Sequence, residues 1–253
     1  MFELNNVYAI DCLEGMKRLP DNFIDLTVTS PPYDNLRNYK GFSFDFESIA
    51  HELYRITKSG GVLVWVVGDA TVNGSETCTS FKQVLYFRDL GFNLHDTMIY
   101  RKKTPPLTHK RYEQEFEFMF VFVKGKIQTF NPILVDKLYM DKRSNKAFSR
   151  NKTNEHDMGF SSRKTQRIKG NVWEYLVGGG KSTKDKIAFQ HPAIFPEQLA
   201  ADHILSWSNE GDLIFDPMCG SGTTLKMAKQ LGRNFLGFDI SHEYVEIAKQ
   251  RII

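Results

Sequence analysis

Five consecutive residues near the N-terminus, Thr29-Ser30-Pro31-Pro32-Tyr33, carry groups that could hold an amino-bearing base. The Ser30 hydroxyl and the Pro31 carbonyl can accept hydrogen bonds, and the two prolines fix the backbone without an N–H to donate. The ring of Tyr33 offers a flat face for the base. An exocyclic amino nitrogen is a poor nucleophile because its lone pair is delocalised, and two acceptors on its hydrogens favour a pyramidal nitrogen that can attack. An ordinary turn after a strand also fits these residues.

A glycine-rich segment near the other end of the chain has the residue types of a cofactor-binding turn. It reads Asp216-Pro217-Met218-Cys219-Gly220-Ser221-Gly222-Thr223-Thr224 and follows the apolar run 213–215. Glycine permits a tight backbone, and the exposed N–H groups of the following helix can bind a carboxylate or a phosphate. A second apolar run ends in Asp239, 23 residues after Asp216. An acid in that place can bind the two hydroxyls of a ribose.

The competing interpretations of this segment differ in the ligand. A phosphate-binding loop of an NTPase would need a lysine before Thr223, where Gly222 stands. A nicotinamide fingerprint would need Gly-x-Gly-x-x-Gly, which the segment lacks. A site for S-adenosylmethionine fits better, with Asp216 facing the methionine amino group and the helix N–H groups facing its carboxylate. A strand–turn–helix without a ligand is the remaining alternative.

Short apolar runs alternate with helical periods along most of the chain. The expected strands are 25–29, 62–67, 94–100, 116–122, 213–215 and 234–238, and the expected helices are 46–56, 80–90, 196–207, 223–231 and 243–252. The run 62–67 is fully apolar, as in a strand buried on both faces, and 59–61 should end the helix before it. The phenylalanines that alternate within 116–122 are interpreted as core residues. Strands that alternate with helices predict a doubly wound α/β fold with a mostly parallel sheet.

Size and composition limit the class of protein. The 253 residues fit one large domain, or one domain with an insertion, and 41% of them are hydrophobic. Apolar runs stay well below the roughly 18 residues that span a bilayer, and the first residues do not resemble a signal peptide. The three cysteines, Cys12, Cys78 and Cys219, form neither a disulfide framework nor a Cys-x-x-Cys metal site. We therefore expect a cytoplasmic protein.

Positive charge is concentrated in one part of the chain. The segment 137–190 holds 13 Lys and Arg against 5 Asp and Glu, although the net charge of the whole chain is only +3. A polyanion partner and a solvated surface loop both fit this charge. The stretch 137–185 also shows little periodicity, so we expect it to be irregular and either functional or disordered.

Taken together, these motifs resemble the permuted beta class of DNA amino-methyltransferases. Ser30-Pro31-Pro32-Tyr33 matches the catalytic tetrapeptide of that family. The segment 216–224 matches its cofactor motif Asp-Pro-Phe-x-Gly-Ser-Gly-Thr-Thr, with Met218 in place of phenylalanine. Two further matches are Asp11-Cys12-Leu13 and His191-Pro192-Ala193-Ile194-Phe195-Pro196. The resemblance covers nearly the whole chain except 137–185.

The resemblance implies a circularly permuted, Rossmann-like methyltransferase fold with a seven-stranded, mostly parallel sheet. The catalytic half would be 1–103, the inserted target-recognition region 104–190 with a core strand at 112–124, and the S-adenosylmethionine-binding half 191–253. In unpermuted members the cofactor half comes first. In unpermuted members, the helix equivalent to the one after Asp239 is followed directly by the strand equivalent to the one that bears Asp11. In this chain that strand lies near the N-terminus and that helix near the C-terminus.

The resemblance also implies which residues form the site. Ser30, Pro31, Pro32 and Tyr33 would be catalytic. Asp11 would contact the cofactor adenine and Asp239 its ribose, and His191 and Phe195 would help to close the pocket. The full predicted cofactor set is Asp11, Cys12, His191, Phe195, Asp216, Met218, Cys219, Gly220, Ser221, Gly222, Thr223, Thr224, Asp239 and Ile240. No metal site is predicted.

Two of these residues have an alternative interpretation. Without the resemblance, Asp11 is best interpreted as a helix cap. A cytosine ring-carbon methyltransferase would need a nucleophilic cysteine after a proline, but Cys219 follows Met218. Cys219 is therefore interpreted as a small residue in the pocket wall.

The region 104–190 is predicted to recognise double-stranded DNA. The basic residues Lys142, Arg143, Lys146, Arg150 and Lys152 are expected to meet phosphates. Arg163, Lys164, Arg167 and Lys169 are expected to meet phosphates or guanine edges. No membrane partner is predicted, and a homodimer and a cognate restriction endonuclease stay open as further partners.

The implied reaction transfers a methyl group from S-adenosylmethionine to the exocyclic amino group of a flipped-out base, in line and without a covalent enzyme intermediate. Serine in the first position of the tetrapeptide is more usual for the family's cytosine-N4 enzymes, and aspartate for its adenine enzymes. Cytosine N4 is therefore favoured and adenine N6 is the alternative. A methyltransferase acting on RNA or a protein amide, and a catalytically silent DNA-binding subunit, are more distant alternatives.

Overall fold

The structure, a computed structural model, divides into two compact units, Met1–Asn131 with Asn171–Ile253, and Pro132–Gly170. It describes residues 2–32, 44–102, 111–137, 146–150, 156–160, 165–178 and 180–253, with the backbone alone in 146–150 and 156–160. Within these ranges no helix is long and apolar enough to cross a membrane. Each unit is described by itself.

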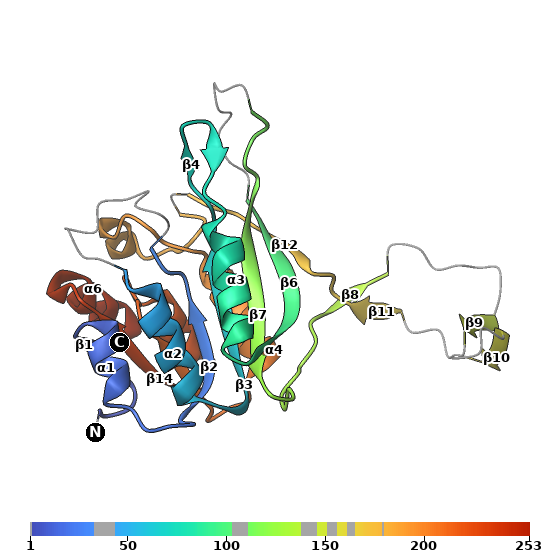
Figure 1. Cartoon of the computed structure of the whole chain (residues 1–253), viewed down its shortest axis with the longest axis horizontal. Helices are drawn as coiled ribbons and strands as arrows, with labels where there is room; N and C mark the ends of the chain where they lie inside the picture. Colours follow the sequence, from blue (N-terminus) through green and yellow to red (C-terminus); the bar gives the residue numbers. More distant parts are fainter. Residues whose placement is uncertain are drawn as a thin grey trace. The chain divides into compact units, whose positions relative to one another are not determined.

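The larger unit is built around an eight-stranded sheet (Figure 1). In spatial order its strands are β1 (Asn6–Ala9), β14 (Asn234–Asp239), β13 (Leu213–Asp216), β2 (Ile24–Thr29), β3 (Thr57–Val67), β7 (Phe116–Lys124), β6 (Phe92–Lys102) and β12 (Val172–Tyr175). Neighbouring strands are parallel except that β7 runs antiparallel to both β3 and β6. The predicted α/β fold with a mostly parallel sheet is confirmed.

The sheet has one strand more than the expected seven, which we attribute to β12. This short strand pairs in parallel with β6 at the edge of the sheet. Its Trp173 and Tyr175 are buried, whereas Val172 and Glu174, which alternate with them, are exposed. Four residues give too short an alternation for a sequence pattern to stand out.

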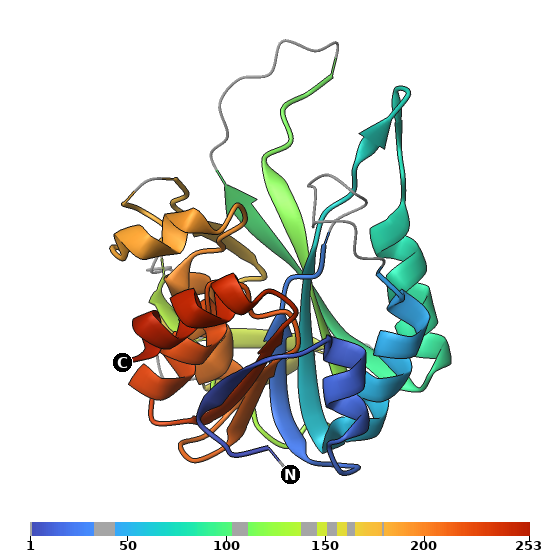
Figure 2. The same ribbon diagram turned by 90° about the vertical axis from the view of Figure 1, so that its left-hand side faces the viewer.

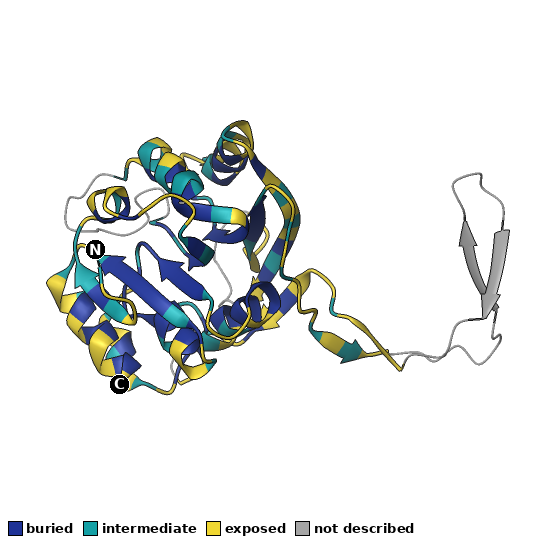
Figure 3. Cartoon of the chain, turned by 90° about the horizontal axis from the view of Figure 1, so that it is seen from below, coloured by how far each residue is buried: buried dark blue, intermediate teal, exposed yellow. Residues whose placement is uncertain are grey.

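Two helical layers cover the sheet, one on each face (Figure 2). One layer holds α1 (Cys12–Lys17), α2 (Phe46–Ile56) and α3 (Thr79–Asp89), and the other holds α4 (Glu197–Trp207), α5 (Thr223–Gln230) and α6 (His242–Ile252). Trp65 of β3 packs against Phe87 of α3 with ring centroids 5.2 Å apart. On the other face the His203 ring of α4 approaches the Met119 sulfur of β7 at 3.2 Å. Burial on both faces explains why 62–67 is apolar throughout. Figure 3 shows buried residues along the strands of the sheet and exposed residues on the outer sides of the helices.

The pairing of β1 with β14 joins segments from opposite ends of the sequence. Asn6 to Ala9 run in parallel with Leu236 to Asp239, and Ile10 N–H donates to the Asp239 carbonyl at 3.0 Å. This is the adjacency that the permuted order implies. Figure 2 shows the two strands side by side.

The segment 59–61 was expected to end a helix and instead lies inside β3. The helix α2 ends at Ile56 and β3 begins with the next residue. The pairing of β2 with β3 shifts register between Ile24 and Leu26, opposite this segment, and Gly60 has φ +83°. The glycine pair therefore forms a bulge, where one residue must take a left-handed conformation.

The phenylalanines of β7 are core residues only in part. Phe120 and Phe122 are buried, but Phe116 is 37% exposed and Phe118 is half-buried. Met119 and Val121 between them are also buried, because this end of β7 lies between two strands and two helical layers. The alternation of phenylalanine with other residues therefore does not separate a buried face from an exposed one.

The stretch 137–185 was expected to be irregular, but strands run through it. In the smaller unit β8 (Leu134–Asp136) pairs with β11 (Gln166–Ile168), and β9 (Lys146–Arg150) pairs with β10 (His156–Phe160), both antiparallel. In the larger unit β12 and the 3₁₀ helix η1 (Lys186–Gln190) follow, and β4 (Thr71–Val72) forms a short hairpin with β5 (Ser75–Glu76). The strands β8 and β11 are largely exposed, so they lack the apolar alternation by which strands are recognised.

Candidate active site

The two sequence motifs meet at the carboxyl ends of β2 and β13, which are neighbouring strands of the sheet. Thr29, the last residue of β2, donates its hydroxyl to the Asp216 carboxylate, with Oγ1 to Oδ1 at 2.8 Å. Both residues are buried, with 0% and 2% of their surface exposed. The Thr224 hydroxyl at the start of α5 donates to the Val28 carbonyl at 3.1 Å. Two segments 187 residues apart are therefore joined by direct hydrogen bonds.

The predicted catalytic tetrapeptide begins directly after this junction. Ser30 is half-buried, Pro31 is buried and Pro32 is half-buried. The fourth predicted catalytic residue, Tyr33, lies outside the described residues. The carboxyl ends of parallel strands are where such sheets place their ligands, and Ser30 stands at that position of β2.

The glycine-rich turn after β13 can be built only with glycine at two positions. Gly220 has φ +49° and Gly222 has φ +77°. A Cβ atom on Gly220 would stand 2.7 Å from Nε2 of His191, and one on Gly222 would stand 2.7 Å from Cβ of Ala248. Both distances are shorter than real contacts, so the turn is closed by His191 on one side and by α6 on the other.

Asp216 is a buried carboxyl at the start of the turn. Burial raises its pKa to about 7, while hydrogen bonds from Thr29 and the Met218 N–H act in the opposite direction. A buried carboxyl with a raised pKa becomes fully ionised when a cation binds beside it. The ammonium group of S-adenosylmethionine is such a cation, so Asp216 fits the predicted contact.

Asp239 connects the end of β14 to the same turn. Its carboxylate accepts from the N–H of Gly220 and from the N–H of Ser241, both at 2.9 Å. Burial raises its pKa, and the two backbone hydrogen bonds lower it. Each carboxylate oxygen keeps a second lone pair, which leaves capacity for hydroxyl donors such as those of a ribose. The neighbouring Ile240 is 39% exposed.

Asp11 is the N-cap of α1. Its Oδ1 accepts from the N–H of Leu13 at 2.9 Å and from the N–H of Glu14 at 3.1 Å. The helix-cap interpretation is therefore correct, and it does not prevent a ligand contact because the side chain is exposed. The adenine contact that the resemblance implies stays a prediction.

The two cysteines of the predicted cofactor set are poor nucleophiles. Burial, reinforced by the charge of Asp11, raises the pKa of the Cys12 thiol to about 12. Burial also raises the pKa of Cys219 well above its usual range, with the charge of Asp216 as the next cause. Both side chains are therefore thiols at neutral pH, whereas a nucleophile must be a thiolate.

His191 lies over the turn and Phe195 follows it in the same segment. The His191 ring packs against Tyr244 of α6 with centroids 4.4 Å apart, and its Nδ1 is 3.1 Å from the Ala193 nitrogen. Phe195 is half-buried. Sequence reasoning missed Tyr244, which no motif marks.

Sequence reasoning also missed Thr29 and Arg251 as site residues. Thr29 is the first residue of the motif 29–33, but no role was predicted for its side chain. Arg251 is seven residues beyond Tyr244 in α6, and it donates to Ser221 of the turn at 2.6 Å. Its position in the sequence gives no sign of this contact.

The predicted DNA-contact residues are described only in part. Lys146 and Arg150 lie in β9, Arg167 is exposed in β11 and Lys169 follows that strand. The other five, Lys142, Arg143, Lys152, Arg163 and Lys164, lie outside the described residues.

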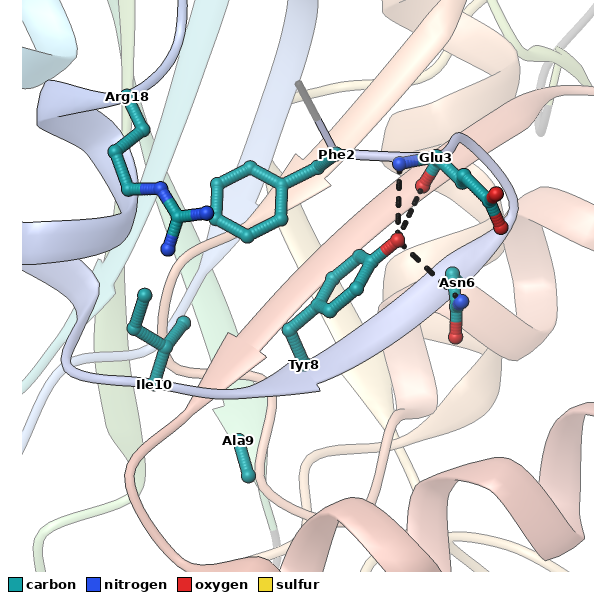
Figure 4. Close-up of a pocket in the computed structure, with 7 residues that line it drawn as sticks. All are labelled: Phe2, Glu3, Asn6, Tyr8, Ala9, Ile10 and Arg18. Carbon is teal, nitrogen blue, oxygen red and sulfur yellow. Dashed lines mark hydrogen bonds between the residues drawn. The ribbon is translucent and has the colours of Figure 1, made fainter.

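A shallow pocket of about 480 Å³ lies elsewhere, along β1 (Figure 4). Its lining comes from residues between Phe2 and Arg18. The Arg18 guanidinium lies 4.5 Å from the centroid of the Phe2 ring, and Tyr8 accepts a hydrogen bond from the Glu3 N–H at 2.9 Å. The pocket is not the site predicted at the ends of β2 and β13.

Comparison with known proteins gives a family match over most of the chain. The model of the N6_N4_Mtase family, described as DNA methylase, matches residues 24–250.

Individual relatives and solved structures agree with this match. The chain is 56% identical to "Orphan methyltransferase M.BamHII" of Bacillus amyloliquefaciens over 93% of this chain and 91% of that protein. A DNA modification methylase of Thermus thermophilus, solved in complex with S-adenosyl-L-methionine, is 25% identical with a TM-score of 0.68, covering 98% of this chain and 92% of that one. The cytosine-N4-specific PvuII DNA methyltransferase shares the fold, with 18% identity, a TM-score of 0.72 and coverage of 98% and 86%.

Proposed function

This chain belongs to the DNA methylase family, and on that premise we propose that it methylates the N4 amino group of cytosine in duplex DNA. The protein is an S-adenosylmethionine-dependent DNA amino-methyltransferase. The choice of cytosine rests on Ser30, because serine in this position is more usual among the family's cytosine-N4 enzymes. Adenine N6 is the alternative.

The hydrogen bond from Thr29 to Asp216 is the observation that carries the proposed site. It fixes the residue before Ser30 to the acid that begins the glycine-rich turn. A base held at Ser30 and a methionine amino group held at Asp216 would therefore be neighbours. Close positioning of the two reactants can remove a large part of the barrier to a bimolecular reaction.

S-adenosylmethionine supplies a methyl group bonded to a positively charged sulfur, which departs as a neutral thioether. The Ser30 hydroxyl and the Pro31 carbonyl accept from the amino group of the extruded base and direct its lone pair outward. As the new nitrogen–carbon bond forms, the amino nitrogen loses one proton to solvent. Cys12 and Cys219 take no part as nucleophiles, because burial keeps both protonated.

In the proposed binding mode, several of the predicted cofactor residues each contact a different part of the cofactor. Asp216 holds the methionine ammonium and Asp239 the ribose. The N–H groups at the start of α5 face the methionine carboxylate. Asp11 reaches the adenine, and His191 closes the turn from above.

The base can be identified directly. Duplex DNA is incubated with the full-length protein and S-adenosylmethionine carrying a deuterated methyl group, digested to nucleosides and analysed by mass spectrometry. Labelled N4-methylcytosine is the expected product. Labelled N6-methyladenine would overturn the choice of base but not the family assignment, and DNA without label would overturn the choice of duplex DNA as substrate.

Target recognition is proposed for 104–190, with its basic residues on the DNA. The support is the excess of positive charge in 137–190 and the separate compact unit Pro132–Gly170 within this range. Replacing Pro132–Gly170 by the corresponding segment of a relative that modifies a different DNA sequence tests the assignment. Methylation at the relative's sequence is expected, and an unchanged methylated sequence would contradict it.

A homodimer and a cognate endonuclease stay predictions. One relative is named an orphan methyltransferase, and a second, 28% identical over 98% of this chain, is named Type II methyltransferase M.BglII, from Bacillus subtilis. Light scattering of the purified protein measures whether it is a homodimer. Assaying the products of the neighbouring genes for cleavage of unmethylated DNA tests whether a cognate endonuclease exists.

A further inference from the structure

A buried arginine near the end of α6 is bonded to the glycine-rich turn. The side chain of Arg251 has 0% of its surface exposed. Its Nη1 donates to the Ser221 carbonyl at 2.6 Å, to the Ser221 hydroxyl at 2.9 Å and to the Thr223 hydroxyl at 3.1 Å. One guanidinium nitrogen thus contacts both residues that flank Gly222.

The other nitrogens of Arg251 bind two acids from a different part of the chain. Nη2 donates to Glu197 at 2.9 Å and Nε donates to Asp185 at 3.2 Å. Lys226 of α5 lies 2.7 Å from each of the same two carboxylates. We call these four residues, two cations and two anions, the Arg251 cluster.

The two acids stand at the ends of the segment that carries His191. Asp185 precedes η1 and Glu197 begins α4, so 185–197 is fixed at both ends by the cluster. In the middle of this segment His191 lies against Gly220 and Tyr244. Arg251 therefore ties the turn itself to the segment that covers it.

The Arg251 cluster is an unfavourable arrangement if it only stabilises the fold. Taking charges out of water costs several kcal/mol per ion, and well-packed apolar residues often replace a buried ion pair without loss. A planar guanidinium has five donors in fixed directions, and here its three nitrogens reach two separate chain segments. Such a group suits the task of holding two segments at one spacing.

We propose that Arg251 is a positioning residue for S-adenosylmethionine, which sets the spacing between the glycine-rich turn and the segment 185–197. The proposal rests on the proposed cofactor site. Arg251 acts through Ser221, Thr223 and the two acids, so its loss should weaken binding of the cofactor and leave the chemistry at Ser30 almost unchanged. The alternative is that Arg251 only stabilises the fold.

The test compares Arg251→Met with Arg55→Met. Arg55 is a matched control, since it also binds two acids, Glu52 and Asp21, and two backbone carbonyls, those of Met16 and Leu19. Its partners all lie in 16–52, away from the turn. Both variants are studied in the full chain at a temperature where circular dichroism shows them folded. The measurements are the Kd of S-adenosylmethionine by calorimetry, the Kd of duplex DNA, and kcat and KM.

We expect Arg251→Met to raise the Kd and the KM for S-adenosylmethionine by about tenfold or more, with kcat at saturation within about threefold. DNA affinity should stay within about twofold, and Arg55→Met should leave the Kd of S-adenosylmethionine unchanged within the same margin. Hydrogen exchange of the amides in 185–195 should quicken in Arg251→Met alone.

Equal losses of cofactor affinity in both variants, or an unchanged Kd in Arg251→Met, would overturn the proposal. If Arg251→Met does not fold, Lys226→Met and Asp185→Asn carry the same test from the more exposed side of the cluster. Normal cofactor affinity in both would then overturn it. Failure of the unmodified protein to bind S-adenosylmethionine would instead refute the proposed site.

Discussion

At the scale of single residues, Asp216 is the central acid of the proposed cofactor site. It is buried, it accepts from Thr29, and burial raises its pKa to about 7. Because the folded-state pKa exceeds the ordinary aspartate value of 3.8, the protonated form stabilises the free protein. That stability is fully present below the unfolded pKa and is lost as pH rises toward 7 and above.

Cofactor affinity should have the opposite dependence on pH. The ammonium of S-adenosylmethionine needs the ionised carboxyl, so affinity should rise between pH 6 and pH 8 by roughly tenfold, as the ionised fraction of Asp216 rises. Calorimetric titrations across this range measure it. Asp216→Asn should bind weakly with a flat profile, and a profile as steep as that of the unmodified protein would show that another group titrates.

Thr29 should affect the pH dependence of cofactor binding. Thr29→Val removes the hydroxyl that stabilises the ionised Asp216 and keeps the shape of the side chain, so the pH midpoint of cofactor binding should move upward. Thr29→Ser keeps the donor and should keep the midpoint. Titrations of both variants decide the matter, and equal midpoints in the two would contradict a role for the hydroxyl.

Ser30 should matter for turnover and little for cofactor binding. Ser30→Ala removes one of the two acceptors for the amino group, and we expect kcat to fall by about 100-fold or more. The Kd of S-adenosylmethionine should change by less than about twofold. Ser59→Ala, at an exposed serine of β3, serves as the control. Near-normal turnover in Ser30→Ala would count against the assigned role.

At the scale of elements, the glycine-rich turn is held in place by what packs around it. Gly220→Ala would need a left-handed alanine, which costs about 1–2 kcal/mol, and would also press a methyl group on His191. Gly211→Ala needs the same kind of conformation, φ +83°, but its methyl group would meet open space. Thermal melts and calorimetry should show a similar left-handed cost in both variants and a loss of cofactor affinity, by about tenfold or more, only in Gly220→Ala. Equal affinity in the two would refute the contact with His191.

The elements that sequence patterns predicted well are those with a strong period or a clear stop. Helix α3 and strand β13 begin and end within one residue of expectation, because Gly91 stops the helix and the apolar run of the strand is continuous. The errors have physical causes: a glycine pair that forms a bulge in β3, and the exposed strands β8 and β11 of the smaller unit, which lack apolar alternation. The junction of Thr29 with Asp216 agrees with the order of motifs, whereas the contacts of Arg251 depend on packing that no local pattern encodes.

At the scale of the whole molecule, charge should govern binding to DNA. If about five of the basic side chains in 137–190 meet phosphates, the logarithm of affinity should fall with the logarithm of salt with a slope of about −4.5. Arg167→Gln should reduce that slope by about 1. Lys126→Gln should leave the slope unchanged. Lys126 follows β7, which runs antiparallel to β3, so it lies at the opposite end of the strands from Ser30. Fluorescence anisotropy at several salt concentrations measures the slopes, and an affinity independent of salt would refute the DNA-contact assignment.

The order of strands in the sheet has a consequence for how this protein is made. Two of its strands, β1 and β2, are translated before β13 and β14, which separate them in the sheet. The nascent chain therefore carries a gap within its central sheet until β13 and β14 have been synthesised. Pairing across such a sequence distance is slow, and unpaired strand edges attract other chains. The hydrogen bond between Thr29 and Asp216 can therefore form only after β13 has been translated.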